Sequence, residues 1–518
     1  MREGFQRFRS SGLVAALLVA TVPVLFLWAH NVHDRIRSVD VMLVLASCWV
    51  GTALLYAVLR MLLHDPRRAG LATSALVLLF CVFGRLAGSQ GIYPGSSQAT
   101  LLLLGFGALA GALVVMIARA RSSLAGIVRG VVTIAAVLVA VNVWTILTSG
   151  PVARASNDLA TSADVDARSL TPTQPVRDVY YLIFDRYANG SVLRDLYGFD
   201  NEPFLSSLEE RGLVVLDGAV ANYPGTTHSL ASSLNMTYLD DLASDVGEDS
   251  DDWGPLQGAL QGSAVQEAFD SMGYRTVHIG SWWEPTYADP SADTNHVFAG
   301  LREFSQAFLF TTAAPWLADA LHVMDIRDPA RTQFERVAYQ LDAIEETSRD
   351  PGATFTFAHL TLPHTPYVFD AEGRYRPEGR DMPVEAAYLD QLRATNTMIG
   401  ELLDELLAGP TATDPIVVLQ SDEGPHPPAL DAEPELRVEW PSAPQADLER
   451  KLRILDVMYL PGVPSSRIDP AMTPVNTFRM IMSEYFGGDF PPLDDRVYVY
   501  TRFERPYDFI DVTDRFRT

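Results

Sequence analysis

Two stretches of the chain end an apolar run in acidic side chains. The run VVLQS at 417–421 is followed at once by Asp422 and Glu423, and the run DVYYLIF ends at Asp185. Neighbouring carboxylates repel each other unless a positive charge lies close, and a divalent cation can supply that charge. Acids in such places also occur as solvated loop residues or as turn caps, so both interpretations stay open here.

A pair of hydroxyl side chains stands where a turn leads into a predicted helix. The stretch NYPGTTHSLASSLN at 222–235 predicts a turn at Pro224 and Gly225 and a helix from about His228. Thr226 and Thr227 then lie at the helix N-terminus, where backbone N–H groups favour negative charge. One interpretation is a nucleophile activated by a base or a metal, and the other is an ordinary N-cap.

Two histidines come close together in the stretch FTFAHLTLPHTPYVFD. His359 is predicted on a strand, and His364 in the loop that follows it. A single histidine in such a place has an even chance of being structural. Two of them, on a strand and its exit loop, favour a polar site.

The candidate ligands predict the kind of cation. Asp185, Thr226, Asp422 and Glu423 offer only oxygen atoms. Hard cations prefer such ligand sets, whereas zinc favours nitrogen and sulfur. We therefore expect one divalent cation as the cofactor, with Mn²⁺ or Mg²⁺ favoured and Ca²⁺ as a further possibility.

An α/β domain can bring these residues together, because ligands gather at the carboxyl ends of parallel strands. Short β-rich runs alternate with helical patterns after residue 177, which predicts a mainly parallel sheet flanked by helices. The expected strands are 178–184, 213–216, 275–279, 353–360, 415–420 and 454–460. The expected helices are 202–211, 228–236, 263–272, 328–348 and 385–408.

The first 150 residues predict a membrane domain. Five apolar stretches, at 11–29, 41–63, 70–92, 99–118 and 124–148, are each near the ~20 residues that a spanning helix needs. Arginines gather before the first stretch and in alternate loops, which places the N-terminus in the cytoplasm. We expect a multi-pass cell-membrane protein with a transmembrane domain at 1–150, a linker at 151–176 and an extracytoplasmic domain at 177–518.

Charge and cysteine content exclude other classes of function. The chain of 518 residues has 39 Lys and Arg against 64 Asp and Glu, a net charge of -25. Nucleic-acid binding needs a basic surface, so we expect no nucleic acid as a partner. The two cysteines, Cys48 and Cys81, lie in apolar stretches, so the soluble part contains no cysteine nucleophile.

Over roughly 177–500 the chain resembles the alkaline phosphatase–sulfatase superfamily, and most closely the membrane-anchored branch with lipoteichoic acid synthases and phosphoethanolamine transferases. The resemblance implies an alkaline phosphatase-like fold after five transmembrane helices. It also implies that Asp185 is a metal ligand and that Thr226, followed by Ser229 three residues later, is the nucleophile. Thr227 is the second candidate. The motif Pro363-His364-Thr365-Pro366 resembles a loop whose histidine contacts the transferred group.

Two departures from that family pattern limit what it implies. The family usually reads Asp-His-Gly at the metal site, but this chain reads Asp422-Glu423-Gly424. That change disfavours zinc and a two-metal site, and it makes His426 a candidate replacement for the imidazole. The chain also lacks the Cys/Ser-x-Pro-x-Arg motif of sulfatases, which disfavours hydrolysis of sulfate esters.

Together these features predict a membrane-anchored, metal-dependent phosphoryl-type transferase or hydrolase that acts on a cell-envelope lipid or glycan. Thr226 would attack, and His364, with His359 or His228, would stabilise oxygens or protonate the leaving group. Trp282, in the loop 279–289, is expected to line a substrate pocket, with ordinary packing as the alternative. The alternative functions are a sulfate-ester hydrolase and a catalytically inactive envelope binding protein.

Overall fold

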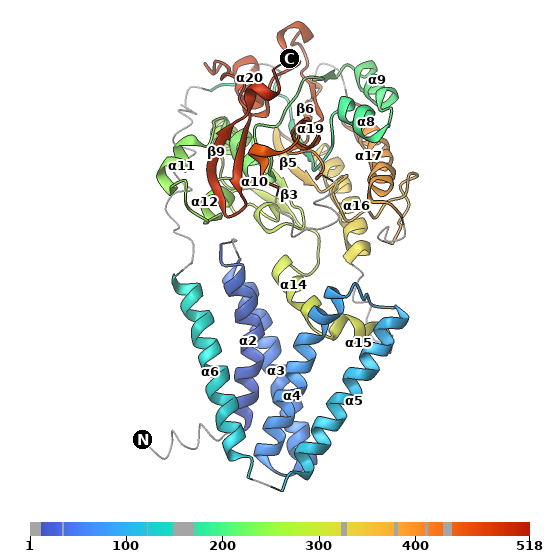
Figure 1. Cartoon of the computed structure of the whole chain (residues 1–518). Coiled ribbons are helices and arrows are strands. Elements are labelled where there is room, and N and C mark those ends of the chain that lie inside the picture. Colours follow the sequence, from blue (N-terminus) through green and yellow to red (C-terminus); the bar gives the residue numbers. More distant parts are fainter. Residues whose placement is uncertain are drawn as a thin grey trace. The chain divides into compact units, whose positions relative to one another are not determined.

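The computed structural model of the chain divides into two compact units (Figure 1). The helical unit comprises Met1–Pro151 and Leu301–Asp328, and the α/β unit comprises Val152–Gly300 and Pro329–Thr518. The structure describes residues 12–33, 36–121, 123–148, 170–172, 175–322, 329–377, 382–409, 413–427 and 438–517. Most of the predicted linker, including all of 151–169, lies outside the described residues.

The helical unit contains the five predicted apolar helices. They are α2 (Gly12–His30), α3 (Ser38–Leu63), α4 (Pro66–Ser89), α5 (Ser97–Arg119) and α6 (Ala125–Thr148). Each is long and apolar enough to cross a membrane. The third begins four residues before the predicted start because Asp65 caps it, accepting hydrogen bonds from the backbone N–H groups of Arg67 and Arg68.

Two short helices from the middle of the sequence also belong to the helical unit. They are α14 (Glu303–Thr311) and α15 (Ala314–Leu321), which the sequence prediction placed within the domain 177–518. Arg302 forms an ion pair of 3.2 Å with the largely buried Asp40 at the start of α3. Phe304 and Phe308 of α14 complete an apolar cluster with side chains of α2 and α3.

A glycine allows the connection between α14 and α15 to lie directly on α4. A side chain at Gly84 would place its Cβ 2.2 Å from the backbone oxygen of Phe310, well inside contact distance. At this point the N–H of Ala313 donates a 2.8 Å hydrogen bond to the carbonyl oxygen of Phe80 in α4. Trp316 packs edge-on against Phe83 at 5.5 Å between ring centroids. The contact is therefore made by backbone as well as by side chains.

The α/β unit is built on a seven-stranded sheet with the strand order β2-β7-β6-β1-β5-β3-β4. The strands are β1 (Val179–Phe184), β2 (Val214–Val215), β3 (Arg275–Ile279), β4 (Thr294–His296), β5 (Thr354–Leu360), β6 (Ile416–Gln420) and β7 (Asp456–Tyr459). β1 runs parallel to both of its neighbours, β5 and β6. Only β7 pairs antiparallel on both sides, with β6 and β2. The predicted mainly parallel sheet is confirmed.

Helices cover both faces of this sheet, which is why every residue of β1 is buried. One face packs against α10 (Thr226–Asn235), α13 (Ala264–Ser271) and α20 (Thr477–Tyr485). The other packs against α8 (Gly190–Tyr197), α9 (Glu202–Glu210), α16 (Pro329–Thr347) and α17 (Val384–Leu406). The remaining elements are α11 (Asp240–Val246), α12 (Gly254–Gly258), α19 (Gln445–Leu452) and a hairpin of β8 (Tyr498–Arg502) and β9 (Arg505–Asp511).

Replacing Gly84 should release the α14–α15 connection from α4. In a background with Cys48→Ala and Cys81→Ala, the variant Gly84→Val should speed the labelling of a cysteine placed at the buried Ala313 by a membrane-permeant maleimide, because a Cβ cannot coexist with the Phe310 backbone. Gly88→Val is the matched control, since a Cβ at Gly88, one turn further along α4, meets no atom within 4 Å. Equal labelling rates in the two variants would contradict this account of the contact.

Candidate active site

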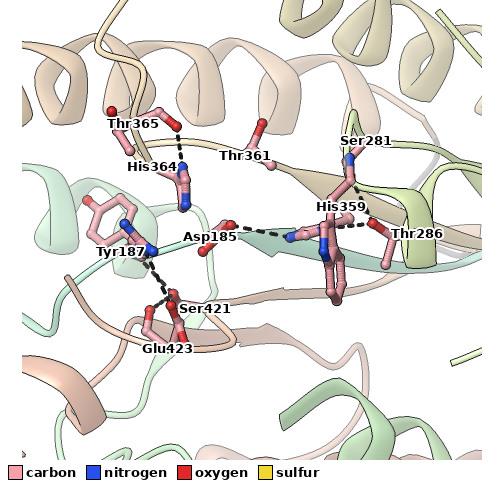
Figure 2. Close-up of polar contacts among 12 residues, drawn as sticks. Asp185, Tyr187, Ser281, Thr286, His359, Thr361, His364, Thr365, Ser421 and Glu423 are labelled. Carbon is pink, nitrogen blue, oxygen red and sulfur yellow. Dashed lines mark hydrogen bonds and ion pairs between the residues drawn. The ribbon is translucent and has the colours of Figure 1, made fainter. Parts of the chain in front are cut away.

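Three buried side chains converge at the carboxyl ends of the central strands. Asp185 follows β1, His359 lies near the end of β5, and Asp422 follows β6. Because β1 lies between β5 and β6 and runs parallel to both, these positions meet at one edge of the sheet. One ligand atom from each lies within 4.8 Å of the others, and Figure 2 shows His359 directed at Asp185, with 3.6 Å between Nε2 and Oδ2.

Most of the polar atoms that face one another in this group have no hydrogen-bond partner among the described residues. They are Asp185 Oδ1, His359 Nε2 and both carboxyl oxygens of Asp422. Buried polar atoms are almost always satisfied, because leaving them unpaired costs free energy. Two carboxylates and an imidazole with free lone pairs therefore fit a bound cation.

A second layer of contacts orients the imidazole of His359. Its Nδ1 lies 2.8 Å from the hydroxyl of Thr286, which in turn contacts Ser281 at 2.8 Å (Figure 2). The tautomer with its proton on Nδ1 donates to Thr286 and leaves the Nε2 lone pair facing the two acids. Such outer contacts fix the ring and tautomer of metal-binding histidines.

The two carboxyl groups differ in their electrostatic environments. Burial raises the pKa of Asp422 well above its usual value, and the neighbouring Asp185 and Glu423 raise it further. Burial also acts to raise the pKa of Asp185, but His364, His359 and Arg186 lower it by more, so its pKa is below the usual value. The structure thus holds one stabilised carboxylate, Asp185, next to Asp422, in which burial and the neighbouring acids outweigh the effect of Lys451.

Thr226 comes from a different element, the helix α10, and lies beside Asp422. It is the first residue of α10, and Gly225 is the N-cap, so Thr226 is not the helix cap that the alternative interpretation required. Its hydroxyl lies close enough to Asp422 to oppose the rise in the pKa of that carboxyl. Thr226 is half-buried whereas Thr227 is buried, which leaves Thr226 as the more accessible of the two hydroxyls.

His364 and Trp282 lie beside the same group. His364 Nδ1 donates to the carbonyl oxygen of Thr365, and its backbone N–H donates to that of Asp185 at 3.1 Å (Figure 2). Burial lowers the pKa of His364 to about 4 and the nearby Arg186 adds to this, so the imidazole is neutral at pH 7. The centroid of the half-buried Trp282 ring lies 6.4 Å from that of the His364 ring.

Glu423 points to basic residues of the protein. Its Oε1 atom lies 2.6 Å from Lys451 Nζ and 3.3 Å from Arg186 Nε, and the Glu423 and Lys451 side chains are almost completely buried. Arg186 has a positive φ of 63°, which is unusual for a residue other than glycine, and its guanidinium donates to His426 Nε2 at 2.9 Å. Glu423 and His426 are thus both engaged by protein cations, and neither belongs to the group of Asp185, His359 and Asp422.

Sequence reasoning missed Arg186 and Lys451. Each had a signal: Arg186 directly follows the predicted ligand Asp185, and Lys451 is the only lysine of the chain. A single buried lysine in an arginine-rich sequence is a position at which the compact ammonium is specifically required, and here it fits against the Glu423 carboxylate.

His228, also predicted as a site residue, lies on α10 with its ring in the aromatic core. Its side chain is completely buried, and its Nε2 lies 2.8 Å from the carbonyl oxygen of Pro506 in the β8–β9 hairpin. The ring stacks on Tyr500 at 5.0 Å, and burial lowers the pKa of His228 to about 4. It is placed as a neutral histidine of the aromatic core.

The arrangement matches a known family of enzymes. The sulfatase family model matches residues 181–482, which is more than half of the chain. The chain belongs to the sulfatase family, and the predicted resemblance to the alkaline phosphatase–sulfatase superfamily is confirmed. No curated protein matches the chain in sequence.

Several solved structures align with the chain at low sequence identity. The C-terminal periplasmic domain of EcEptC from Escherichia coli is 15% identical with a TM-score of 0.43, over 66% of this chain and 93% of that one. The integral membrane lipooligosaccharide phosphoethanolamine transferase A from Neisseria meningitidis is 11% identical with a TM-score of 0.39, over 91% and 95%. The phosphonate monoester hydrolase of Agrobacterium radiobacter is 11% identical with a TM-score of 0.40, over 62% and 80%. These values are too low to transfer the role of any residue.

The ion pair of Glu423 and Lys451 should show strong energetic coupling. Glu423→Gln leaves two buried cations without their carboxylate and should lower the free energy of unfolding by about 3–5 kcal/mol. Adding Lys451→Met removes one of those cations and should restore part of the loss. Thermal unfolding of the full-length protein in detergent measures each variant, and a double variant no more stable than Glu423→Gln would show that the pair is uncoupled.

Proposed function

We propose that the protein is a membrane-anchored, metal-dependent phosphoryl-type transferase or hydrolase with Thr226 as its nucleophile. Membership of the sulfatase family supports an enzyme of this superfamily. The observation that carries the proposal is the meeting of unpaired ligand atoms from Asp185, His359 and Asp422 with the Thr226 hydroxyl next to Asp422.

The proposed cation site comprises Asp185, His359, Asp422 and the oxygen of Thr226. Two carboxylates and one imidazole suit a cation that accepts both oxygen and nitrogen ligands, so Mn²⁺ is our first choice, with Mg²⁺ next and Ca²⁺ less suited. When bound, the cation would lower the pKa of the hydroxyl and neutralise charge that develops on the transferred group. Glu423, although predicted as a ligand, has Lys451 and Arg186 to balance its charge.

Thr226, the N-terminus of α10 and His364 have the remaining proposed roles in the reaction. Thr226 Oγ1 forms a bond to phosphorus while the bond to the leaving-group oxygen breaks, which gives a covalent phosphothreonine. The hydroxyl proton of Thr226 passes through His364 Nε2 to the leaving-group oxygen, and the proton that His364 takes in the second step returns to Thr226 Oγ1. The N–H groups at the start of α10 face the anionic group. His364, with its proton on Nδ1 held by Thr365, presents Nε2 to take a proton from the acceptor hydroxyl or water in the second step. The bond from phosphorus to Thr226 then breaks, and the hydroxyl is restored.

The substrate class follows from where the domain is held. Five apolar helices precede the α/β unit, so the enzyme acts beside a membrane, and arginine placement favours the extracytoplasmic side. We propose a cell-envelope lipid or a lipid-linked glycan as one substrate, approached past Trp282 beside His364. Six of the predicted site residues thereby have proposed roles, and His228 is assigned to the aromatic core.

Two other functions remain candidates, each because of a particular observation. Sulfate-ester hydrolysis is the activity after which the family is named, but the missing Cys/Ser-x-Pro-x-Arg motif opposes it. An inactive binding protein is favoured by Glu423, which occupies the position of the family's histidine and is paired with Lys451.

Replacing each of the two adjacent threonines in turn should show which hydroxyl is the nucleophile. In the full-length protein Thr226→Val should lower turnover of a phosphodiester or phosphomonoester by about 10³-fold or more, because the attacking oxygen is lost. Thr227→Val is the matched control and should keep most of the activity. Mass spectrometry of trapped enzyme should find the phosphate on Thr226. The reverse ranking of the two variants would assign the nucleophile to Thr227, and turnover of a sulfate ester alone would refute the phosphoryl assignment.

Metal content should distinguish the ligands from their neighbours. His359→Ala and Asp422→Asn should each lose the bound metal, because each removes one of the few ligand atoms. The double variant Glu423→Gln with Lys451→Met should retain it. Elemental analysis of purified protein measures both, and loss of metal from the double variant would restore Glu423 as a ligand. Absence of metal and of turnover in the unaltered protein would favour the binding-protein alternative.

A further inference from the structure

The hairpin of α14 and α15 lies at one particular end of the helical unit. Its aromatic side chains contact residues at the end of α2 and the start of α3, and others at the end of α4 and the start of α5. Consecutive spanning helices alternate in direction, so all four of these ends lie on one side. The end of α6 at Thr148 lies on that side too, and there the chain leaves for the α/β unit.

The hairpin contacts α4 well before the C-terminal end of that helix. Ala313 donates to the carbonyl oxygen of Phe80, which lies nine residues before Ser89, the last residue of α4. At 1.5 Å per residue this is about 14 Å along the helix. Phe106 of α5, nine residues after Ser97, packs against Phe83 in the same cluster. The connection between α14 and α15 is therefore at a depth where the spanning helices are apolar on their outer sides.

Several hydroxyl and backbone N–H groups at this depth have hydrogen-bond partners within the protein. The hydroxyls of Thr311 and Thr312 donate to the carbonyl oxygens of Phe308 and Leu309, each at 2.7 Å. The N–H of Ala314 donates to the Thr312 hydroxyl at 3.1 Å, and that of Ala313 is used by α4. Pairing of this kind suits a connection in lipid, where no water is present to satisfy backbone polar groups.

The side of α15 that carries Leu317 and Leu321 is apolar, and the exposed Asp319 lies on another side of this helix. Leu317 and Leu321 are four residues apart on α15, so they lie on the same side, and both are exposed within the described structure, as is Leu301 before α14. Trp316 faces inward against Phe83. Exposed leucines that continue the apolar surface of α5, where Leu101 and Leu104 are also exposed, indicate contact with hydrocarbon.

We propose that the segment 301–321 is a second membrane anchor, with the Leu317–Leu321 face of α15 in the bilayer leaflet on the side where α6 ends. The occupant of this face is lipid acyl chain, as it is for the outer surface of α5. The α/β unit is then attached to the bilayer both through α6 and through this hairpin, which the chain enters at Gly300–Leu301 and leaves at Asp328–Pro329. This anchor is independent of the reaction that the α/β unit performs.

Nitroxide accessibility in the reconstituted full-length protein tests this anchor. Single cysteines replace Leu317, Leu321, Leu104 and Val384 in the background with Cys48→Ala and Cys81→Ala, and each is spin-labelled in phosphatidylcholine–phosphatidylglycerol vesicles. Leu104, in the span α5, is the lipid control. Val384 is the matched aqueous control, because it is also an exposed apolar residue of a helix, at the start of α17.

Labels at 317 and 321 should show a ratio of oxygen to nickel-chelate collision rates near that of position 104 and well above that of position 384. A ratio equal to that of position 384 would place the face in water and overturn the proposal. Low collision rates with both reagents would mean that protein covers the face, and this too would overturn it. Activity is not part of the readout, so the result does not depend on the proposed reaction.

Discussion

The close approach of two carboxyl groups at the ends of neighbouring parallel strands is the constraint on which the site depends. The sheet places Asp185 and Asp422 together because β1 and β6 pair in register, and burial removes the water that would otherwise screen them. The protein relieves this repulsion on one side only. Asp185 has His364, His359 and Arg186 nearby, whereas Asp422 has the Thr226 hydroxyl and only the smaller effect of Lys451, whose ammonium is paired with Glu423. A site of this kind is arranged for a charge that comes from outside the chain.

The cluster of Glu423, Lys451 and Arg186 leaves Asp185 and Asp422 as the place where a cation from outside the chain is needed. Without a positive partner, the Glu423 carboxylate would add negative charge beside Asp422 at the carboxyl ends of the strands. Lys451 and Arg186 neutralise it from within the fold, and the positive φ of Arg186 lets its guanidinium turn back past Asp185 towards Glu423. Protein cations here have fixed positions, unlike an exchangeable ion, so the geometry around Asp422 is set before any ligand arrives.

The sequence predicted the elements well because their signals are local. Continuous apolar runs identified the five long helices and the buried strands, and strand ends identified Asp185 and Asp422. His359 and Thr226 were also singled out, but the contact of His359 with Asp185 and the ion pair of Glu423 with Lys451 were not predicted. These contacts depend on which side chains meet after folding: His359 approaches Asp185 from β5, and Glu423 meets a lysine 28 positions later in the chain. Pairings across such distances have no periodicity to reveal them.

The hairpin of α14 and α15 was missed for a similar reason. Its two helices have nine and eight residues, too short to be recognised as membrane-associated from composition. Only the glycine at position 84 and the buried acid at position 40 mark where it packs, and both lie more than 200 residues earlier.

That same hairpin imposes an order on biogenesis. The strands β3 and β5 pair with each other, yet the segment between them joins the bundle formed by the first 148 residues. During synthesis the nascent chain therefore alternates between two destinations, and the sheet is completed by strands made after the hairpin. A nascent chain that ends before residue 350 would contain every segment of the helical unit but lack β5 and β6, the two strands that flank β1.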